Sequence, residues 1–176
     1  MSFPVELVKY NPKWPEQFEE EKRLILKTFQ DFTIQVEHVG STSISGVSAK
    51  PIIDIMVGIE SLAEVDRYIE LFKTIGYDFN PEWEDRFPER VALYKSDNGN
   101  KIHLYIVEFN TDYWLRHIQF RDYLREHPEV AKEYNKLKEE LAKKYRDDQA
   151  AYTSGKSKFF KEIERKARKK HQKYTS

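Results

Sequence analysis

The sequence predicts an α+β domain in which a mixed β-sheet is flanked by helices and followed by a helical C-terminal third. Three observations support this fold class. Residues 36–57 have the layout of strand, small polar turn and strand, residues 91–109 have that of a hairpin, and the chain from Asp112 onward has helical periodicity. Because 176 residues can bury a substantial core, we expect one domain over 1–176.

The N-terminal half is expected to supply the sheet. A weak alternation at 3–10 predicts a short edge strand, and Pro15 suits the first turn of a helix at about 13–30. The spacing of apolar residues predicts a second helix that begins near Leu62 and stops at Gly76. Strands are expected at 33–39, 52–57 (ending at Gly58), 91–95 and 101–109, with 77–83 extended and 84–90 a charged loop.

The helical extension is expected to span about 111–170 and to contain three helices. Pro128 ends the first and can begin the second, and Asp147-Asp148 can cap the third. The third helix is expected to carry Tyr152, Phe159 and Ile163, and a polar basic tail to follow after about Ala167.

The composition excludes several classes of protein. Aromatic residues make up 14% of the chain, which argues against disorder, and the absence of cysteine excludes disulfides and thiolate metal sites. The N-terminus does not resemble a signal peptide, and no uncharged apolar run approaches the length that spans a membrane. We therefore expect a cytoplasmic protein with no membrane partner.

The net charge is zero, but residues 156–173 carry nine Lys or Arg against two Glu. This concentration of positive charge allows an anionic partner such as RNA, a hypothesis that rests on charge alone. The alternative, which we favour, is a solvated helix whose basic C-terminal end suits its own dipole.

The chemistry is expected around residues 40–54. The turn from Gly40 to Ser48 is rich in Gly, Ser and Thr, so its backbone N–H groups can approach an anion closely. Asp54 follows in an apolar, β-branched run, where a carboxylate is costly unless it is paired or binds a cation.

Gly40-Ser41 followed by Asp54 resembles the signature of the nucleotidyltransferase superfamily. The resemblance implies that the Gly-Ser turn holds nucleotide phosphates and that the acidic strand holds divalent metal ions such as Mg²⁺, which neutralise charge in phosphoryl transfer. That signature has a second acid two residues after the first, on the same face of the strand. Met56 stands there in this chain, and it is not a ligand for Mg²⁺.

A wider set of motifs resembles the GrpB family. These motifs are Glu37-His38-Val39-Gly40-Ser41-Thr42, Ala49-Lys50-Pro51-Ile52-Ile53-Asp54-Ile55 and Phe120-Arg121-Asp122-Tyr123-Leu124-Arg125. The resemblance covers nearly the whole chain and implies a nucleotidyltransferase-like fold. Similar sequences also occur as an extra domain fused to some dephospho-CoA kinases.

His103 and Tyr105 lie on the face of their strand opposite Ile102, Leu104 and Ile106. If this strand neighbours the Asp54 strand, His103 could act as the metal ligand or base that Met56 does not supply, and such a His–carboxylate pair would favour Mn²⁺ or Zn²⁺. The alternative is an ordinary hydrogen bond or ion pair between Asp54 and His103 inside the sheet. The sequence leaves both interpretations open.

Further candidates can contact phosphate. Ser41 and Thr42 have no accompanying Ser-His-Asp motif, so we expect them to bind phosphate rather than to act as nucleophiles. The other candidates are Lys50, Arg86, Arg90, Tyr105 and, on a helix with His117, Arg121. A solvent-exposed or surface-paired role is the alternative for Lys50, Arg86, Arg90 and Arg121. His38 and Glu37 alternate, so only one of the two can face Asp54.

Two functional hypotheses follow. The first is a metal-dependent, nucleotidyltransferase-like enzyme that acts on a nucleotide or another phosphorylated small molecule, with Asp54 and His103 as catalytic and metal-binding residues. The second is a non-catalytic module that keeps the phosphate-binding turn and has lost the second metal carboxylate, as Met56 suggests.

Overall fold

The computed structural model describes residues 4–81 and 88–174, the last four of them by their backbone alone. The described residues form a five-stranded sheet with the strand order β1-β2-β5-β4-β3. Its strands are β1 (Gln35–Val39), β2 (Ile52–Ile59), β3 (Asp78–Phe79), β4 (Arg90–Asp97) and β5 (Asn100–Glu108). β2 and β5 are parallel and the other pairs are antiparallel, so the sheet is mixed, as predicted.

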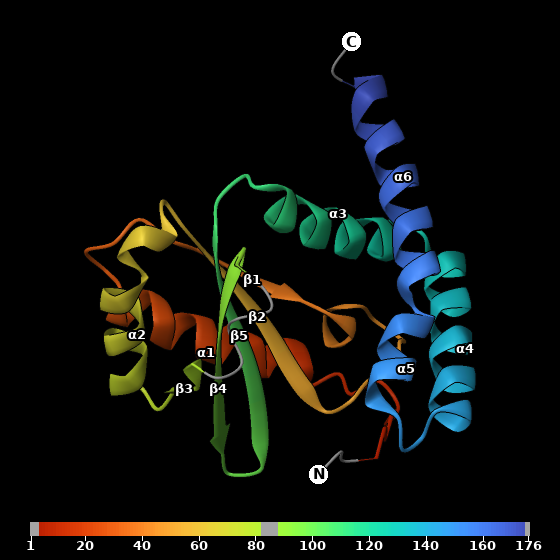
Figure 1. Ribbon diagram of the computed structural model, residues 1–176, viewed down its shortest axis with the longest axis horizontal. Coiled ribbons are helices and arrows are strands. Elements are labelled where there is room, and N and C mark those ends of the chain that lie inside the picture. The colour runs from red at the N-terminus through yellow and green to blue at the C-terminus, as the bar shows by residue number, and fades with distance from the viewer. Residues whose placement is uncertain (1–3, 82–87, 175–176) are drawn as a thin grey trace.

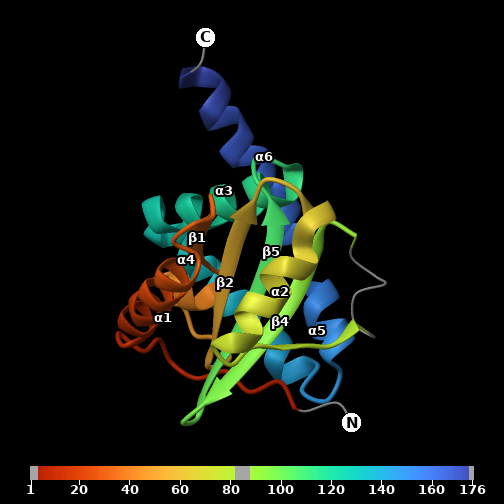
Figure 2. The same ribbon diagram turned by 90° about the vertical axis from the view of Figure 1, so that its left-hand side faces the viewer.

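Helices cover both faces of this sheet. The helices α1 (Trp14–Thr28) and α2 (Val65–Thr74) lie on one side, and the C-terminal helices lie on the other (Figures 1 and 2). The C-terminal helices are α3 (Asp112–Glu126), α4 (Pro128–Lys144), α5 (Gln149–Gly155) and α6 (Ser157–Tyr174), and two short 3₁₀ turns are η1 (Ser41–Ser43) and η2 (Leu62–Glu64). This arrangement confirms the α+β fold class.

The side of the sheet that faces α1 and α2 is the main hydrophobic core. Alternate residues of β2, among them Ile53, Ile55 and Val57, point to this side together with Leu104 of β5 and pack with Phe72 of α2. The residues that alternate with these in β2 and β5 point to the opposite side of the sheet. Asp54 pairs with His103, and Met56 with Tyr105, in the parallel register of β2 and β5.

Met56 belongs to a small apolar cluster on that second side. It is 1% exposed and packs with Val39, Val107 and Trp114. The position at which the nucleotidyltransferase signature has its second acid is therefore part of the apolar surface on which α3 packs. A carboxylate here would be buried among apolar side chains, at a high cost in free energy.

The turn after β1 is held by the C-terminal helices. Ile44 and Val47 are almost completely buried in a cluster with Phe120, Leu124 and other residues of α3, α4 and α6. In addition, the Ser48 backbone N–H donates a hydrogen bond of 2.7 Å to Asn135 Oδ1 of α4. The Gly/Ser-rich turn is thus fixed between the sheet and the helices.

The structure corrects four expectations about element boundaries. Gly58 lies inside β2, which continues to Ile59. The expected edge strand at 3–10 is replaced, in its described part from residue 4, by one isolated bridge from Val8 to Ala49. The predicted third C-terminal helix is divided into α5 and α6, because α5 ends at Gly155, and α6 continues as a helix through the expected tail to Tyr174. The expected extended segment 77–83 is confirmed at Asp78–Phe79, which form β3, and residues 82 and 83 lie outside the described residues.

Gly58 is required by close packing. A Cβ atom at this position would lie 2.6 Å from two ring atoms of Phe109 and 2.9 Å from Trp114 Cζ3.

We predict that Gly58→Ala lowers the free energy of unfolding by about 1–3 kcal/mol, because the rings must shift within a packed cluster. Urea denaturation of Gly58→Ala, Phe109→Leu and the double variant measures this effect. The costs should be less than additive, since Leu leaves room for the new methyl group, and full additivity would contradict the packing argument.

Candidate functional site

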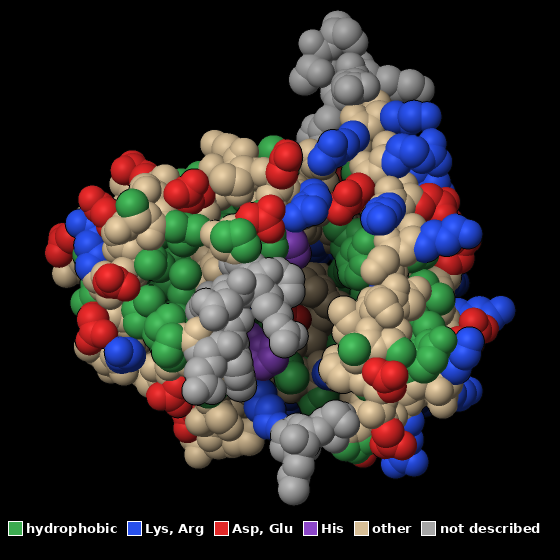
Figure 3. Space-filling view, in the orientation of Figure 1, with side chains coloured by type: hydrophobic (Ala, Val, Ile, Leu, Met, Phe, Trp, Pro, Cys, Tyr) green, Lys and Arg blue, Asp and Glu red, His purple; other side chains and the backbone are tan. Residues whose placement is uncertain are grey.

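Asp54 lies where two cavities meet. Its side chain is 28% exposed and lines both of them, together with Ser41, Tyr105 and Lys156. In the space-filling view a hollow separates the part of the molecule built on the sheet from the C-terminal helices, with histidine and basic side chains along it (Figure 3). The carboxylate therefore belongs to an accessible site and not to the core of the sheet.

Gly40 allows the backbone of the turn to approach this carboxylate. Its φ of 73° is in the region that favours glycine, and a Cβ atom would lie 2.4 Å from Asp54 Oδ2. The spacing between Gly40 and Asp54 follows from the antiparallel pairing of β1 and β2, which sets Val39 opposite Asp54. The Gly-Ser turn and the acidic residue thus meet at one end of the two strands.

The first cavity, the polar cavity, has a volume of about 300 Å³. Its lining combines three lysines with other polar side chains around Asp54. The lining residues that matter here are Ser41, Thr42, Lys50, Asp54, His103, Lys138, Gln149 and Lys156. Lys50 donates a hydrogen bond of 2.6 Å to Gln149 Oε1, and Lys50 and Lys156 both lie within 6 Å of the centre of the Tyr152 ring.

Lys138 connects this cavity to the turn. Its side chain is only 2% exposed, and its Nζ donates hydrogen bonds of 2.6 Å to Ser41 Oγ and to the Ser48 carbonyl oxygen. A buried lysine without a direct carboxylate partner is unusual, because desolvation penalises its charge. Its hydrogen bonds fix the hydroxyl of Ser41 at the junction of the two cavities.

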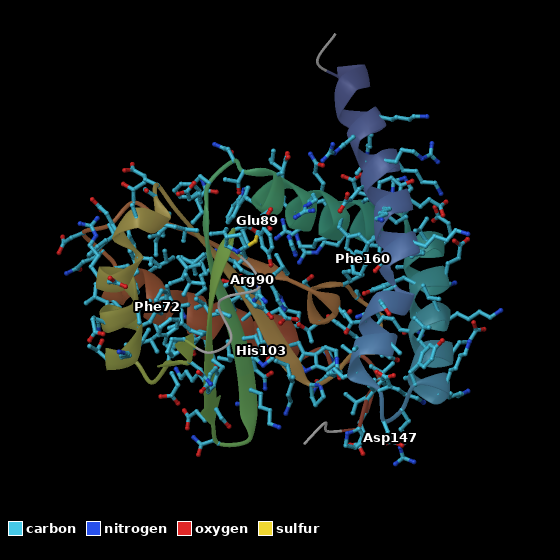
Figure 4. The ribbon with its side chains drawn as sticks, viewed as in Figure 1. Phe72, Glu89, Arg90, His103, Asp147 and Phe160 are labelled. Carbon is cyan, nitrogen blue, oxygen red and sulfur yellow. The ribbon has the colours of Figure 1, made fainter. Side chains whose placement is uncertain are left out.

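The second cavity, the aromatic cavity, has a volume of about 470 Å³. It lies between the sheet and helices α3, α4 and α6. Its ring-bearing lining residues are Tyr105, Tyr113, His117, Phe120, Tyr134 and Phe160, and its charged ones are Asp54, Arg90, Arg116, Lys156 and Glu164. Figure 4 shows Arg90 and His103 on the strands and Phe160 across from them on α6.

Positive charge dominates the electrostatics around Asp54. Burial raises the pKa of the Asp54 carboxyl to about 7, although the charges of Lys138, Lys156, Lys50 and Arg90 all act to lower it. Burial also lowers the pKa of Lys138 to about 7 and that of Lys156 to about 8, and the mutual repulsion of the lysines adds to these shifts. Perturbed groups that line one cavity are typical of functional sites.

Asp54 and His103 are neighbours but are not hydrogen-bonded. His103 Nδ1 lies 4.0 Å from Asp54 Oδ1, which is too long for a direct hydrogen bond. Burial and the nearby charges of Lys50 and Arg90 lower the pKa of His103, which favours the neutral imidazole. The two side chains line the same cavity.

The structure brings most of the sequence-predicted residues together. Gly40, Ser41, Arg90 and Tyr105 line the aromatic cavity, and Ser41, Thr42, Lys50, His103 and Tyr105 line the polar one. The guanidinium group of Arg90 lies over the Tyr105 ring, at 4.6 Å from its centre. His117 lines the aromatic cavity and stacks on Tyr113.

Other predicted residues lie elsewhere. Arg121 lines neither cavity, since its Nη1 contacts Glu37 Oε2 at 2.6 Å and the His38 carbonyl oxygen at 3.0 Å. In the sheet register Glu37 shares the face of Asp54, whereas His38 points to the other face and stacks on Phe18. Arg86 lies outside the described residues.

Sequence reasoning missed Lys138, Lys156, Phe160 and Arg116. One signal was available for Lys138, which follows Tyr134 by four residues and therefore lies on the apolar stripe of its helix. Lys156 stands at the break between α5 and α6, which the sequence analysis treated as one helix. Tyr134 and Phe160 lie in the apolar cluster of the C-terminal helices and also line the aromatic cavity.

Among the residues that the structure describes, Asp54 and His103 are the two donors that bear on the metal expectation. Among the described side chains no three His, Cys, Asp or Glu residues are grouped so that they could hold a metal ion. Asp54 and His103 alone do not form a closed site, and the lysines around Asp54 already supply positive charge there. None of the helices described between residues 4 and 174 combines the length and apolar character that crossing a membrane requires.

Comparisons with known proteins agree with this architecture. The glutamate-rich protein GrpB of Alkalihalophilus pseudofirmus is 40% identical over 160 residues, which are 89% of this chain and 92% of that protein. YqkA of Bacillus subtilis is 38% identical over 94% of this chain, and the chain spans about half (48%) of the length of YqkA. The crystal structure of the conserved protein GrpB from Enterococcus faecalis has a TM-score of 0.79 and 38% identity, and the match covers 95% of this chain and 99% of that one.

A shorter match is to a dephospho-CoA kinase of Mycolicibacterium paratuberculosis. It is 36% identical over 77 residues, which are 42% of this chain and 19% of the kinase, and it agrees with the expected similarity to an extra domain of such enzymes. The family model described as GrpB protein matches residues 4–166. This match and the full-length relatives together show that the chain belongs to the GrpB family.

Proposed function

We propose that this protein binds the phosphate groups of a nucleotide or another phosphorylated small molecule in the polar cavity. The observation that carries the proposal is the convergence of Lys50, Lys138 and Lys156, with Arg90 nearby, around the carboxylate of Asp54. Grouped cations that are partly or fully buried repel one another, and a phosphate would offset that repulsion through charge-assisted hydrogen bonds.

The turn from Gly40 to Ser43 supports the same ligand chemistry. It begins with a positive φ at Gly40 and continues as the 3₁₀ turn η1, and such turns aim backbone N–H groups at an anion. Ser41 Oγ accepts a hydrogen bond from Lys138 Nζ and makes a longer contact, 3.5 Å, with the hydroxyl of Tyr134. With Tyr134 as the donor in that contact, the Ser41 hydroxyl would donate its own proton to a phosphate oxygen.

In the proposed enzyme Asp54 would hold a metal ion that arrives with the ligand. Mg²⁺ is commonly bound by one or two carboxylates together with substrate phosphates and water, so one acid is sufficient once phosphate is present. When bound, the ion would neutralise charge that develops during nucleotidyl or phosphoryl transfer. His103, held neutral beside Asp54, would then serve as a further ligand or as a base.

Met56 favours a second candidate, a binding module without transfer chemistry. Because Met56 is packed against Trp114 and Val107, a second carboxylate at that position would be buried among apolar side chains. The module would keep the phosphate-binding turn and the lysines, and would not need the metal.

Removal of the lysines tests the shared part of both candidates. We predict that Lys156→Met and Lys50→Met each weaken binding of inorganic pyrophosphate, measured by isothermal titration calorimetry, by roughly tenfold, because each removes a charge-assisted contact. Lys136→Met is the matched control, since Lys136 is an exposed residue of the same helix as Lys138 and lines neither cavity. Equal affinity in all four proteins would refute phosphate binding at this site.

The pKa shifts predict a pH dependence. As the pH rises from 6 to 9, Asp54 gains a negative charge near pH 7, and Lys138 and Lys156 lose positive charge near pH 7 and 8. All three changes disfavour an anion, so the affinity for sulfate, whose own charge is constant in this range, should fall by roughly tenfold or more. In Asp54→Asn the affinity at pH 8 should exceed that of the wild type. A flat profile would contradict the assigned electrostatics.

Metal dependence separates the two candidates. For the enzyme we predict that Mg²⁺ or Mn²⁺ increases the affinity for nucleoside triphosphates, that Asp54→Ala removes this increase, and that the metal alone gives no heat of binding, because two donors are too few. Pyrophosphate release from the triphosphate would identify transfer chemistry. Nucleotide binding that is the same with and without metal, and in Asp54→Ala, would instead favour the module.

A further inference from the structure

We infer that the aromatic cavity binds a flat aromatic ring of the same ligand whose phosphate lies in the polar cavity, so that the ligand is a nucleoside phosphate or a similar aromatic phosphate ester. This inference rests on the proposed phosphate site and adds the chemical class of the organic part. It follows from how the two cavities join, from what lines the second one and from a polar atom left without a partner.

The two cavities are continuous with each other at four residues. Ser41, Asp54, Tyr105 and Lys156 line both, so a ligand held by its phosphate beside Asp54 can extend directly into the aromatic cavity. The volume of about 470 Å³ is within the range of small-molecule sites, which runs from roughly 300 to 1,000 Å³. A phosphate alone would leave the larger cavity without a ligand group.

The rings of the aromatic cavity come from four elements. Tyr105 is on β5, Tyr113, His117 and Phe120 are on α3, Tyr134 is on α4 and Phe160 is on α6. Phe120 and Tyr134 are almost completely buried, whereas Tyr105, Tyr113 and Phe160 are partly exposed to the cavity. Partly exposed rings on opposite walls are suited to enclose a third flat ring by stacking.

Charged groups at the same walls can recognise the edge of such a ring. Arg116 lines the cavity, and its Nε is buried without a hydrogen-bond partner among the residues that the structure describes, so an acceptor that reached it would satisfy an unpaired donor. Glu164 lines the cavity from α6 and offers an acceptor for a ring amino group. Apolar walls with a few polar groups are the usual composition of sites that bind ring-containing ligands.

Phe160 and Phe159 form a matched pair for mutation. Both pack partly buried in the cluster around Phe120, and Phe159 stacks on Tyr134 with ring centres 5.1 Å apart. Phe160 lines the aromatic cavity and Phe159 does not. Substitution by leucine keeps an apolar side chain of similar volume at either position and removes the ring.

The experiment is calorimetry of the wild-type chain, Phe160→Leu and Phe159→Leu with inorganic pyrophosphate and with a panel of four nucleoside 5′-diphosphates (adenosine, guanosine, cytidine and uridine) and phenyl phosphate. Methyl phosphate is included as the ring-free control for phenyl phosphate. We expect at least one ring-bearing ligand to bind wild type about tenfold more tightly than its ring-free control, which is pyrophosphate for the diphosphates and methyl phosphate for phenyl phosphate. Phe160→Leu should remove most of this gain without changing the affinity for pyrophosphate, and Phe159→Leu should change neither.

The outcomes separate the two proposals. If pyrophosphate binds and no ring adds affinity, or if Phe160→Leu and Phe159→Leu behave alike, the ring site is refuted and the phosphate site stands. If nothing binds, the phosphate site itself is refuted, and this inference falls with it. Should Phe160→Leu lose its native circular dichroism spectrum, Tyr113→Leu tests the opposite wall by the same comparison.

Discussion

The hydrogen bonds from Lys138 Nζ to Ser41 Oγ and to the Ser48 carbonyl oxygen join the two halves of this molecule. They connect the fourth helix to both ends of the turn that leaves the sheet. Because Lys138 is buried, loss of these bonds would leave polar atoms unsatisfied on both partners. The position of the turn relative to Asp54, and therefore the shape of both cavities, depends on this contact. Apolar packing of Ile44 and Val47 supports it from the other side of the turn.

The two faces of the sheet have different roles, and side chains of β2 alternate between them. Ile53, Ile55 and Val57 stabilise the fold against α1 and α2, while Asp54 is directed to the cavities. Met56 is the exception on the functional face, because it anchors α3 through Trp114. The same helix that closes the aromatic cavity thus requires an apolar residue two positions after the acid. The departure from the nucleotidyltransferase signature has a structural cause within this chain.

The residues of this site that follow from local sequence patterns could be predicted from the sequence. The residues that depend on contacts between distant segments could not. Gly40, Asp54 and His103 could be predicted because strand alternation and turn composition are local signals. The parallel pairing of β2 with β5 then makes Asp54 and His103 neighbours. Lys138, Lys156 and Phe160 depend on how four helices dock onto the sheet. The spacing of residues along a helix does not show how the helix docks. A lysine or a phenylalanine on an apolar stripe has the same spacing whether it faces a core or a cavity. The split between α5 and α6 was missed for the same reason, because the close contact of Gly155 with Leu141 is a tertiary one.

The four cations around Asp54 stand at positions 50, 90, 138 and 156, far apart along the chain. Positions 50 and 90 belong to the sheet half and positions 138 and 156 to the C-terminal helices, so the repulsion between the two pairs arises only when the two halves have come together. The native state carries this repulsion and the unfolded chain does not. An anion bound among these residues would relieve it and would therefore raise the free energy of unfolding. The proposed phosphate ligand would thus also stabilise the folded protein.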